Sequence, residues 1–145
     1  MACGFPAKME RGPPGLTVRP AFYGEGELLQ VKGRDSGRFI LEIPNEEIGK
    51  EQFGLAALSI HHKEDVDEGF QIEAKSAVLW DIKIFDEQWR RRGIGSEWIE
   101  FMKQFAKSQG AERFYAASVQ TESEGFFVKK GFVPHHEDWW IMKEF

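Results

Sequence analysis

An apolar run, a glycine-rich turn and an amphipathic helix follow one another between residues 77 and 108, and this order constrains the fold most. Apolar side chains occupy both parities of Ala77–Phe85, which predicts a strand buried on both faces. The helix predicted over Gly95–Ser108 has apolar residues at three- and four-residue steps. A further strand is predicted over Arg113–Val119. This strand–helix–strand order indicates a parallel pair joined by a right-handed crossover.

The turn between this strand and helix consists of Arg90, Arg91, Arg92, Gly93, Ile94, Gly95 and Ser96. Backbone N–H groups at a helix N-terminus lack intrahelical partners, and the helix dipole adds partial positive charge there. Glycines allow close approach to the backbone, and the three arginines add charge. The turn therefore predicts a site for a polyanionic, phosphate-bearing ligand, and a solvated charge run is the alternative.

Shorter segments around this unit indicate the fold class. Strands are predicted over Leu16–Pro20, Leu28–Val31, Phe39–Ile43, Leu55–Ile60 and, as a pair, over the tail Phe132–Phe145. One helical turn is expected within Glu46–Gln52, and a capping-box pattern at Thr121–Glu124 opens a short helix that ends at Gly131. We expect an α/β (α+β) domain with a mixed, mainly antiparallel central sheet of about six or seven strands and helices on both faces.

Length and composition set the domain organisation. The 145 residues fit one domain, placed at residues 16–145, after a loose leader over residues 1–15 that is rich in glycine and proline. Cys3 is the only cysteine, which excludes an internal disulfide and a cysteine-cluster metal site. No apolar run approaches the roughly 18 residues that span a bilayer, and no signal-peptide pattern is present, so a cytoplasmic protein is expected. The net charge of −5 argues against nucleic acid as a partner.

The order of three blocks is typical of one enzyme family. The first is the R-x-x-G-x-G pattern of Arg90, Gly93 and Gly95, which follows a strand and opens a helix. The second, Gln120–Phe132 (QTESEGFFVKKGF), is a short helix ending in Gly-Phe, and Asp138–Lys143 reads as a last strand. Together they resemble the GCN5-related N-acetyltransferase (GNAT) family, whose acyl-CoA signature is R/Q-x-x-G-x-G/A. The resemblance covers residues 39–145.

This resemblance implies the acyl-CoA N-acyltransferase fold, with reduced N-terminal helices because residues 22–37 lack a helical period. It implies acetyl-CoA (coenzyme A) as co-substrate and no metal. The pyrophosphate would bind the turn at residues 90–96, the pantetheine arm would follow the end of Ala77–Phe85, and Lys129 would lie near an adenosine phosphate. The cofactor-binding residues implied are Ile84, Phe85, Arg90, Arg91, Arg92, Gly93, Ile94, Gly95, Ser96, Gln120, Phe127 and Lys130.

Amine acetylation sets the requirements for the catalytic residues. An alkyl ammonium has a pKa of about 10, so a group must accept its proton before attack. Asp81 is the candidate base because it lies shortly before the turn, on the strand face of Lys83. Pairing of Asp81 with Lys83 or with a neighbouring strand is the alternative, and Glu73 is a weaker candidate base. A backbone N–H near Ile84 or Phe85 is the expected oxyanion donor.

Phe127 departs from the family, because many relatives carry a tyrosine at this position that protonates the leaving thiolate. Phenylalanine has no such proton. Water, Ser118, Ser123 or Tyr115 would then substitute, or the thiolate would leave without an acid, or catalysis has weakened.

The four histidines form two adjacent pairs, His61–His62 and His135–His136. Adjacent side chains on a strand point to opposite faces, so neither pair is a good chelate alone and no metal is expected. One histidine acting as a base near the acceptor is an alternative.

The favoured function is an acetyl-CoA-dependent N-acetyltransferase that moves an acetyl group to a primary amine of a small molecule or protein by direct attack on the thioester. The alternative is a catalytically weak acyl-CoA-binding sensor or scaffold, which Phe127 favours. The expected partner is an amine-bearing acceptor, with no nucleic acid and no membrane, and a homodimer is left open. The sequence does not identify the acceptor amine.

Overall fold

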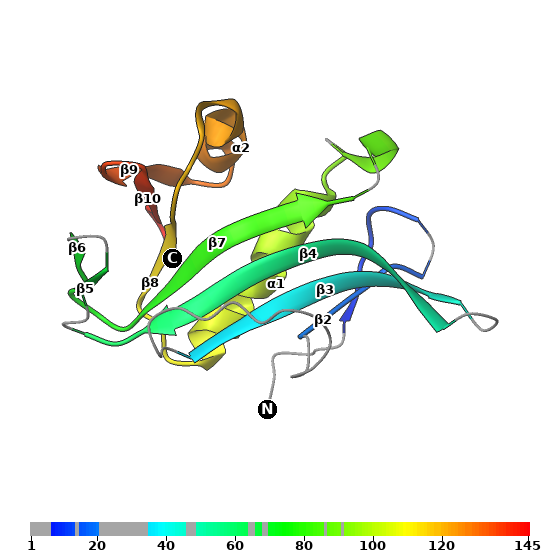
Figure 1. Ribbon diagram of the computed structural model, residues 1–145, viewed down its shortest axis with the longest axis horizontal. Coiled ribbons are helices and arrows are strands. Elements are labelled where there is room, and N and C mark those ends of the chain that lie inside the picture. Colours follow the sequence, from blue (N-terminus) through cyan, green and yellow to red (C-terminus); the bar gives the residue numbers. More distant parts are fainter. Residues whose placement is uncertain are drawn as a thin grey trace.

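The computed structural model describes residues 7–13, 15–20, 35–45, 49–63, 66–67, 70–85, 87–90 and 92–145. Its main sheet has eight strands in the order β1-β2-β3-β4-β7-β8-β10-β9 (Figure 1). These strands are β1 (Ala7–Lys8), β2 (Thr17–Pro20), β3 (Asp35–Asn45), β4 (Gly49–His61), β7 (Ser76–Ile84), β8 (Arg113–Ala116), β9 (Phe132–His136) and β10 (Trp139–Met142). The strands β5 (Val66–Asp67) and β6 (Phe70–Gln71) pair separately. The helices are α1 (Ile94–Ser108) and α2 (Glu124–Lys129), preceded by the 3-10 turns η1 (Glu87–Trp89) and η2 (Thr121–Ser123).

The sheet has the mixed, mainly antiparallel topology that the sequence predicts. β7 and β8 are parallel, and α1 connects them. The other neighbouring pairs of the main sheet are antiparallel. The expected α/β class is therefore confirmed, and the short β1 at one edge brings the described strands of this sheet to eight. The predicted strand Leu28–Val31 and most of the segment 22–37 lie outside the described residues.

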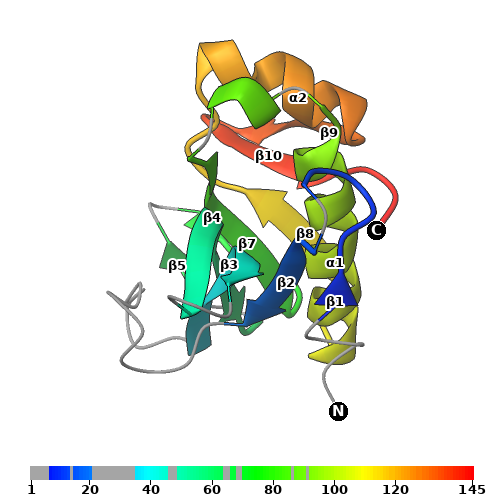
Figure 2. The same cartoon turned by 90° about the vertical axis from the view of Figure 1, so that its right-hand side faces the viewer.

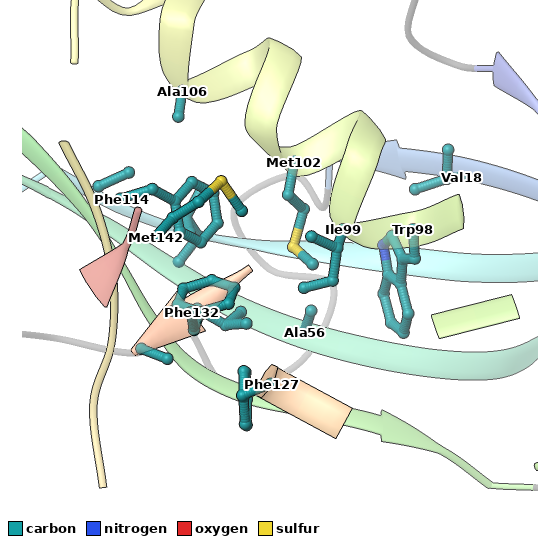
Figure 3. Packing of buried hydrophobic residues seen from close by; sticks show 14 of the residues in the cluster. Val18, Ala56, Trp98, Ile99, Met102, Ala106, Phe114, Phe127, Phe132 and Met142 are labelled. Carbon is teal, nitrogen blue, oxygen red and sulfur yellow. The ribbon is translucent and has the colours of Figure 1, made fainter. Parts of the chain in front are cut away.

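The helix α1 packs an apolar stripe against one face of the sheet. Its buried side chains are Ile94, Trp98, Ile99, Met102 and Ala106. They join a large core cluster with side chains of β4, β8 and β9, which Figure 3 shows from close by. α1 runs along one side of the strands, and α2 lies next to β9 and β10 (Figure 2). Phe127 brings α2 into the same cluster, so the buried sides of both helices share one core.

The opposite face of the sheet carries a smaller, aromatic cluster. Its buried members are Ile72, Val78, Tyr115, Ala117 and Trp139, with Trp80 and Ile141 packed against them. None of the described helices contributes to this cluster, so the helix expected on this face is not among the described elements. β7 is buried on both faces over its first four residues, as predicted, and alternates between half-buried and exposed beyond them.

The N-terminal segment is packed on the domain where it is described, although a loose leader was expected there. β1 pairs with β2, and the Met9 N–H donates to the Leu16 carbonyl at 2.8 Å. Met9 itself is buried. Gly12, Pro13 and Gly15, which belong to the composition that indicates a leader, instead lie between two paired strands, because this sequence signal does not distinguish a leader from a turn. The division into residues 1–15 and 16–145 stays a prediction.

Three local predictions had different outcomes. Gly110 and Gly131 have φ of 84° and 87° and follow the last residues of the two helices, which confirms them as helix stops. The helical turn expected within Glu46–Gln52 is wrong for residues 49–52, because these extend β4. The capping box is also wrong. Thr121, which would be the capping residue, lies inside η2 instead, and neither Gln120 before η2 nor Ser123 before α2 makes a side-chain cap hydrogen bond.

Trp98 tests the core. Replacing this fully buried side chain removes contacts between α1 and the sheet. We expect Trp98→Ala to lower the free energy of unfolding by about 3–5 kcal/mol. Glu100→Ala, at an exposed position of the same helix, is the control and should stay within about 0.5 kcal/mol of the unmodified protein. Urea denaturation followed by circular dichroism measures both values, and equal losses would contradict this account of the core.

Candidate functional site

β7 and β8 pair only over the first part of β7, and the sheet opens beyond it. Their register ends at Leu79 opposite Ala116, with one further hydrogen bond from the Ala117 N–H to the Leu79 carbonyl at 3.0 Å. β7 continues along β4 to Ile84. The register between the two strands shifts at Trp80, which has no opposite residue in β4. Such a bulge bends a strand and increases its twist. From Trp80 to Ile84, no strand of the described part covers the edge of β7 that faces away from β4.

The open edge of β7 presents backbone groups to this gap. The Phe85 N–H donates to the Phe53 carbonyl at 3.0 Å, so Phe85 is bonded toward β4. Because hydrogen-bonded and non-hydrogen-bonded pairs alternate along an antiparallel ladder, the N–H groups of Ile82 and Ile84 point to the open edge. The Ile84 carbonyl accepts a hydrogen bond from Arg90 Nε at 2.9 Å. Of the two predicted oxyanion donors, the Ile84 N–H is the one directed to the gap.

A pocket of about 880 Å³ lies at this opening, between the end of β7, the start of α1 and one side of α2. Six predicted cofactor residues line it, namely Ile84, Arg90, Gly93, Gly95, Ser96 and Phe127. Six further lining residues were not predicted to bind the cofactor, namely Ile82, Lys83, Glu122, Ser123, Gly125 and Phe126. Lys129, expected near an adenosine phosphate, also lines the pocket. The sequence block Gln120–Phe132 could have predicted the lining residues of η2 and α2, because it contains all of them.

Five other predicted cofactor residues lie away from this lining, and Arg92 is one of them. Ile94 is fully buried in the core, because it belongs to the apolar stripe of α1. The Phe85 side chain is 48% exposed. Gln120 is exposed and precedes η2, and Lys130 lines a second cavity of about 460 Å³. Arg91 lies outside the described residues.

Gly93 and Gly95 are needed for different reasons. Gly93 precedes α1 with φ of 88°, a left-handed conformation that favours glycine. A Cβ at Gly93 would lie 2.7 Å from Cδ of Arg11. A Cβ at Gly95 would lie 3.2 Å from the ring of Phe126. Gly95 therefore allows α2 to pack closely on the start of α1, a role that the sequence analysis did not assign to it.

Arg90 and Arg92 make contacts within the loop that precedes α1. Arg90 Nη1 lies 3.6 Å from Glu87 Oε1, and both side chains are exposed, so this pair contributes at most about 1 kcal/mol. Arg92 does not line the pocket, and its Cζ lies 5.1 Å from the centroid of the Trp89 ring. Trp89 meets Phe53 of β4 edge to face at 6.4 Å. These contacts attach the loop to β4.

Asp81, the candidate base, does not line the pocket. It is exposed and stands opposite Ala57 of β4. Ile82 and Ile84 pack against the α1 core, so Asp81 and Lys83 lie on the other face of β7. Among the described residues, no ion pair or hydrogen bond joins the Asp81 and Lys83 side chains. The role of Asp81 as a base stays a prediction.

A polar group borders the aromatic cluster on that face. Arg113 Nη1 donates to the Tyr115 hydroxyl at 3.4 Å and to Glu73 Oε2 at 3.3 Å. The hydrogen bond with Tyr115 is the main cause that raises the pKa of Arg113. The His135 ring lies 5.5 Å from that of Tyr115, and burial, followed by the charge of Arg113, lowers the pKa of His135. Glu73 is thus paired with the guanidinium of Arg113.

The candidate proton donors lie in different places. Ser123 lines the pocket, whereas Tyr115 is buried on the aromatic face. Ser118 is exposed and has φ of 54°, a strained conformation for a residue that is not glycine. Phe127 is buried between Phe126 and Phe132, with ring centroids 5.3 Å away in both contacts. Of these candidate proton donors, Ser123 is therefore the one whose residue lines the pocket.

His61 has a buried position next to the aromatic cluster. Its Nε2 lies 2.9 Å from the Ser59 hydroxyl, which accepts a hydrogen bond from Trp80 Nε1 at 2.7 Å. Within the described ranges, no group of three or more histidine, cysteine, aspartate or glutamate side chains is arranged to hold a metal ion.

Comparison with known families identifies the class of protein. The model of the acetyltransferase (GNAT) family matches residues 16–132, which is most of the chain. The chain therefore belongs to this family of acetyltransferases, and the resemblance drawn from Arg90, Gly93 and Gly95 is confirmed. A comparison with curated proteins gives no match.

Solved structures share the fold at low sequence identity. A complex of KacTA with DNA is 16% identical, with a TM-score of 0.56, over 75% of this chain and 68% of that one. AtaTR bound to acetyl-CoA is 14% identical, with a TM-score of 0.55, over 73% and 66%. The aminoglycoside N-acetyltransferase AAC(6')-Iy in complex with CoA is 19% identical, with a TM-score of 0.55, over 70% and 71%. The chain thus spans about two thirds of the length of these proteins.

The exclusion of nucleic acid from the partners is wrong, because a protein of this fold occurs in a complex with DNA. The net charge of −5 averages over the whole surface and hides local groups of one sign. The cavity of about 460 Å³ shows this, since four of its lining residues are lysines, namely Lys103, Lys129, Lys130 and Lys143. In the described part, no helix is long and apolar enough to cross a membrane.

Gly93 and Gly125 both line the pocket and form a matched pair for testing. Alanine at Gly93 would need φ of 88° and would contact the Arg11 side chain, whereas a Cβ at Gly125 meets nothing within 4 Å. We expect Gly93→Ala to lower the free energy of unfolding by about 1–2 kcal/mol. Gly125→Ala, inside a helix, should raise it by about 0.4–1 kcal/mol. Thermal and urea unfolding measure both values, and a loss at Gly125 as large as at Gly93 would contradict the conformational argument.

Proposed function

We propose that this chain transfers the acetyl group of acetyl-CoA to a primary amine. The observation that carries the proposal is the pocket that joins the open edge of β7 to the N-terminus of α1. Membership of the acetyltransferase (GNAT) family supports the reaction class. Two similar solved structures hold acetyl-CoA or CoA, which supports the co-substrate. A cytoplasmic location remains a prediction from the sequence.

The pocket residues divide into two groups under this proposal. The N–H groups at Gly95 and Ser96, with Arg90, would bind the pyrophosphate, because a helix N-terminus favours anions. The backbone of Ile82 at the free edge of β7 would pair with an amide group of the pantetheine arm, as an added strand does. Phe127 would pack against the arm's apolar stretch.

The reaction itself needs a base, an oxyanion donor and a place for the leaving group. The neutral amine attacks the acyl carbon, an N–C bond forms and the C–S bond breaks. Before attack, the ammonium form of the amine loses one proton to Asp81, directly or through water. After attack, the nitrogen loses a second proton, which passes through water to the sulfur, so coenzyme A leaves as a thiol. The Ile84 N–H is the proposed oxyanion donor, because it points to the open edge while the Phe85 N–H is bonded to Phe53.

The second candidate function is an acyl-CoA-binding sensor or scaffold that turns over slowly. The observation that favours it is Phe127, which lines the pocket and offers no proton to a leaving thiolate. Both functions need the same cofactor pocket, so binding alone does not separate them.

Acetyl transfer is tested by following thiol release from acetyl-CoA with a panel of polyamines, aminoglycosides, amino acids and lysine peptides. With an accepted amine, Asp81→Asn should lower kcat about 100-fold, because the amide accepts no proton. The dissociation constant of coenzyme A should be unchanged, because Asp81 lies outside the pocket lining. Glu100→Gln, the same chemical change at an exposed position of α1, is the control.

Three results would overturn parts of this proposal. Unchanged kcat in Asp81→Asn would remove Asp81 from catalysis. Tight binding of acetyl-CoA without thiol release on the whole panel would favour the sensor. Failure to bind coenzyme A would exclude both functions.

Phe127→Tyr tests whether a missing proton donor limits the reaction. The added hydroxyl would restore the tyrosine of many relatives at a residue that lines the pocket. We expect kcat to rise about tenfold or more, because a positioned general acid contributes about 10²–10⁴-fold and part is lost to imperfect alignment. Phe126→Tyr is the control, since Phe126 lines the same pocket but packs against Gly95. An unchanged kcat in Phe127→Tyr would show that the thiolate leaves without this acid.

A further inference from the structure

The N-terminal segment is fixed to the first turn of α1 by one carboxylate. Glu97 Oε2 accepts a hydrogen bond from the Glu10 N–H at 2.7 Å, and Glu97 Oε1 accepts one from the Arg11 N–H at 2.9 Å. Bonds to an ionised acceptor are shorter and stronger than neutral ones. This bidentate arrangement fixes the backbone of residue 11 beside the pocket-lining end of α1.

The turn after Arg11 is packed tightly as well. Gly12 has φ of 92°, and a Cβ there would lie 2.8 Å from Leu16 Cδ2 and 3.0 Å from Ile94 Cδ1. Leu16 and Ile94 are both fully buried. The described residues 9–13 and 15–16 are therefore packed against the start of α1, with fixed contacts on both sides of Arg11.

The Arg11 side chain lies against Gly93. A Cβ at Gly93 would be 2.8 Å from Nη1 and 3.0 Å from Nε of Arg11, so the guanidinium covers the residue that begins the pocket's helix. Within the ranges that the structure describes, no carboxylate forms an ion pair with this guanidinium. The carboxylate of Glu97 binds backbone N–H groups through both oxygens.

This position is unfavourable for a cation in the absence of an anion. The N-terminus of a helix carries partial positive charge, and cations are disfavoured there. Arg92 lies in the same loop and adds like charge, whereas the charge of Arg90 is paired with Glu87. A phosphate group at the start of α1 would turn each of these repulsions into an attraction.

We propose that Arg11, which lies outside the pocket lining but against the lining residue Gly93, binds a phosphate of the acyl-CoA together with the N-terminus of α1. This inference rests on the proposed function, because it names a second source of charge for the same co-substrate. The N-terminal segment, held by Glu97, thus forms one wall of the phosphate site.

The test compares Arg11→Met with Lys8→Met in the full chain. Both remove one positive charge from an exposed side chain of the same segment, and neither residue is in the pocket lining. They differ in that the atoms nearest a Cβ at Gly93 belong to Arg11, whereas Lys8 lies on β1. Isothermal titration with coenzyme A at low and moderate salt gives the dissociation constants. We expect Arg11→Met to weaken binding about tenfold and to reduce the salt dependence, because one phosphate contact is lost. Lys8→Met should stay within about twofold, and Arg11→Lys should fall between, because lysine keeps the charge without the planar fork.

Pantetheine, which has no phosphate, provides the second readout. Its affinity should be equal in Arg11→Met and in the unmodified protein, whereas a general distortion of the pocket would weaken it too. Melting temperatures without ligand check that both variants are folded. Equal coenzyme A affinities for Arg11→Met and Lys8→Met would overturn the role of Arg11 and leave the proposed function standing. An unmodified protein that does not bind coenzyme A would overturn both.

Discussion

The site depends on the parting of two parallel strands. β8 follows β7 only as far as the Ala116 and Leu79 pair, and the backbone then turns away through Ser118, which has φ of 54°. The next residue, Val119, donates its N–H to the Asp138 carbonyl at 2.9 Å. The Val119 N–H is therefore bonded to the C-terminal part of the chain and not to β7. The bulge at Trp80 occurs at the same level on β7. Without this parting, β8 would cover the edge that Ile82 and Ile84 now present, and no pocket would exist.

Aromatic packing holds the second wall of the pocket in place. Phe127 contacts Phe132 edge to face, and Phe132 contacts Phe114 of β8 in the same way at 5.8 Å. α2 has only six residues, too few to be stable alone, so this chain of rings is what fixes it. On its other side, Phe126 packs over Gly95. The phenyl ring at position 127 therefore serves the wall, and its lack of a hydroxyl is compatible with a structural use of this residue.

Elements with strong local periodicity were predicted well. The helix predicted over Gly95–Ser108 differs from α1 by one residue, and the strand Ala77–Phe85 differs from β7 by one residue at each end. The loop, its glycines and the parallel crossover followed from the same local signals, and so did the family. The predicted cofactor residues that line the pocket all lie within these elements or within α2.

Features that depend on distant contacts were not predictable. The bulge at Trp80 needs knowledge of the β4 register, and the role of Gly95 needs the position of Phe126, 31 residues later. Arg11 lies 82 residues before Gly93 in a segment whose composition indicates a leader. Net charge failed for a related reason, because it sums over residues without regard to where they lie. The sequence contains the residues that make these contacts, but no local pattern in it predicts that they meet.

The arrangement of the two faces restricts how the proposed reaction can proceed. The pocket lies along the open edge of β7 next to α1 and α2, and Lys83 is part of its lining. Asp81 lies outside this lining, on the face of β7 where Trp80, Tyr115 and Trp139 form the aromatic cluster. The gap beyond Leu79 connects the two faces of the sheet, because no strand of the described part fills it. Under the proposed function, an amine deprotonated by Asp81 therefore approaches from the aromatic face and meets the thioester inside the gap. Acceptor selection would then be a property of the aromatic face, and cofactor binding a property of the α1 face.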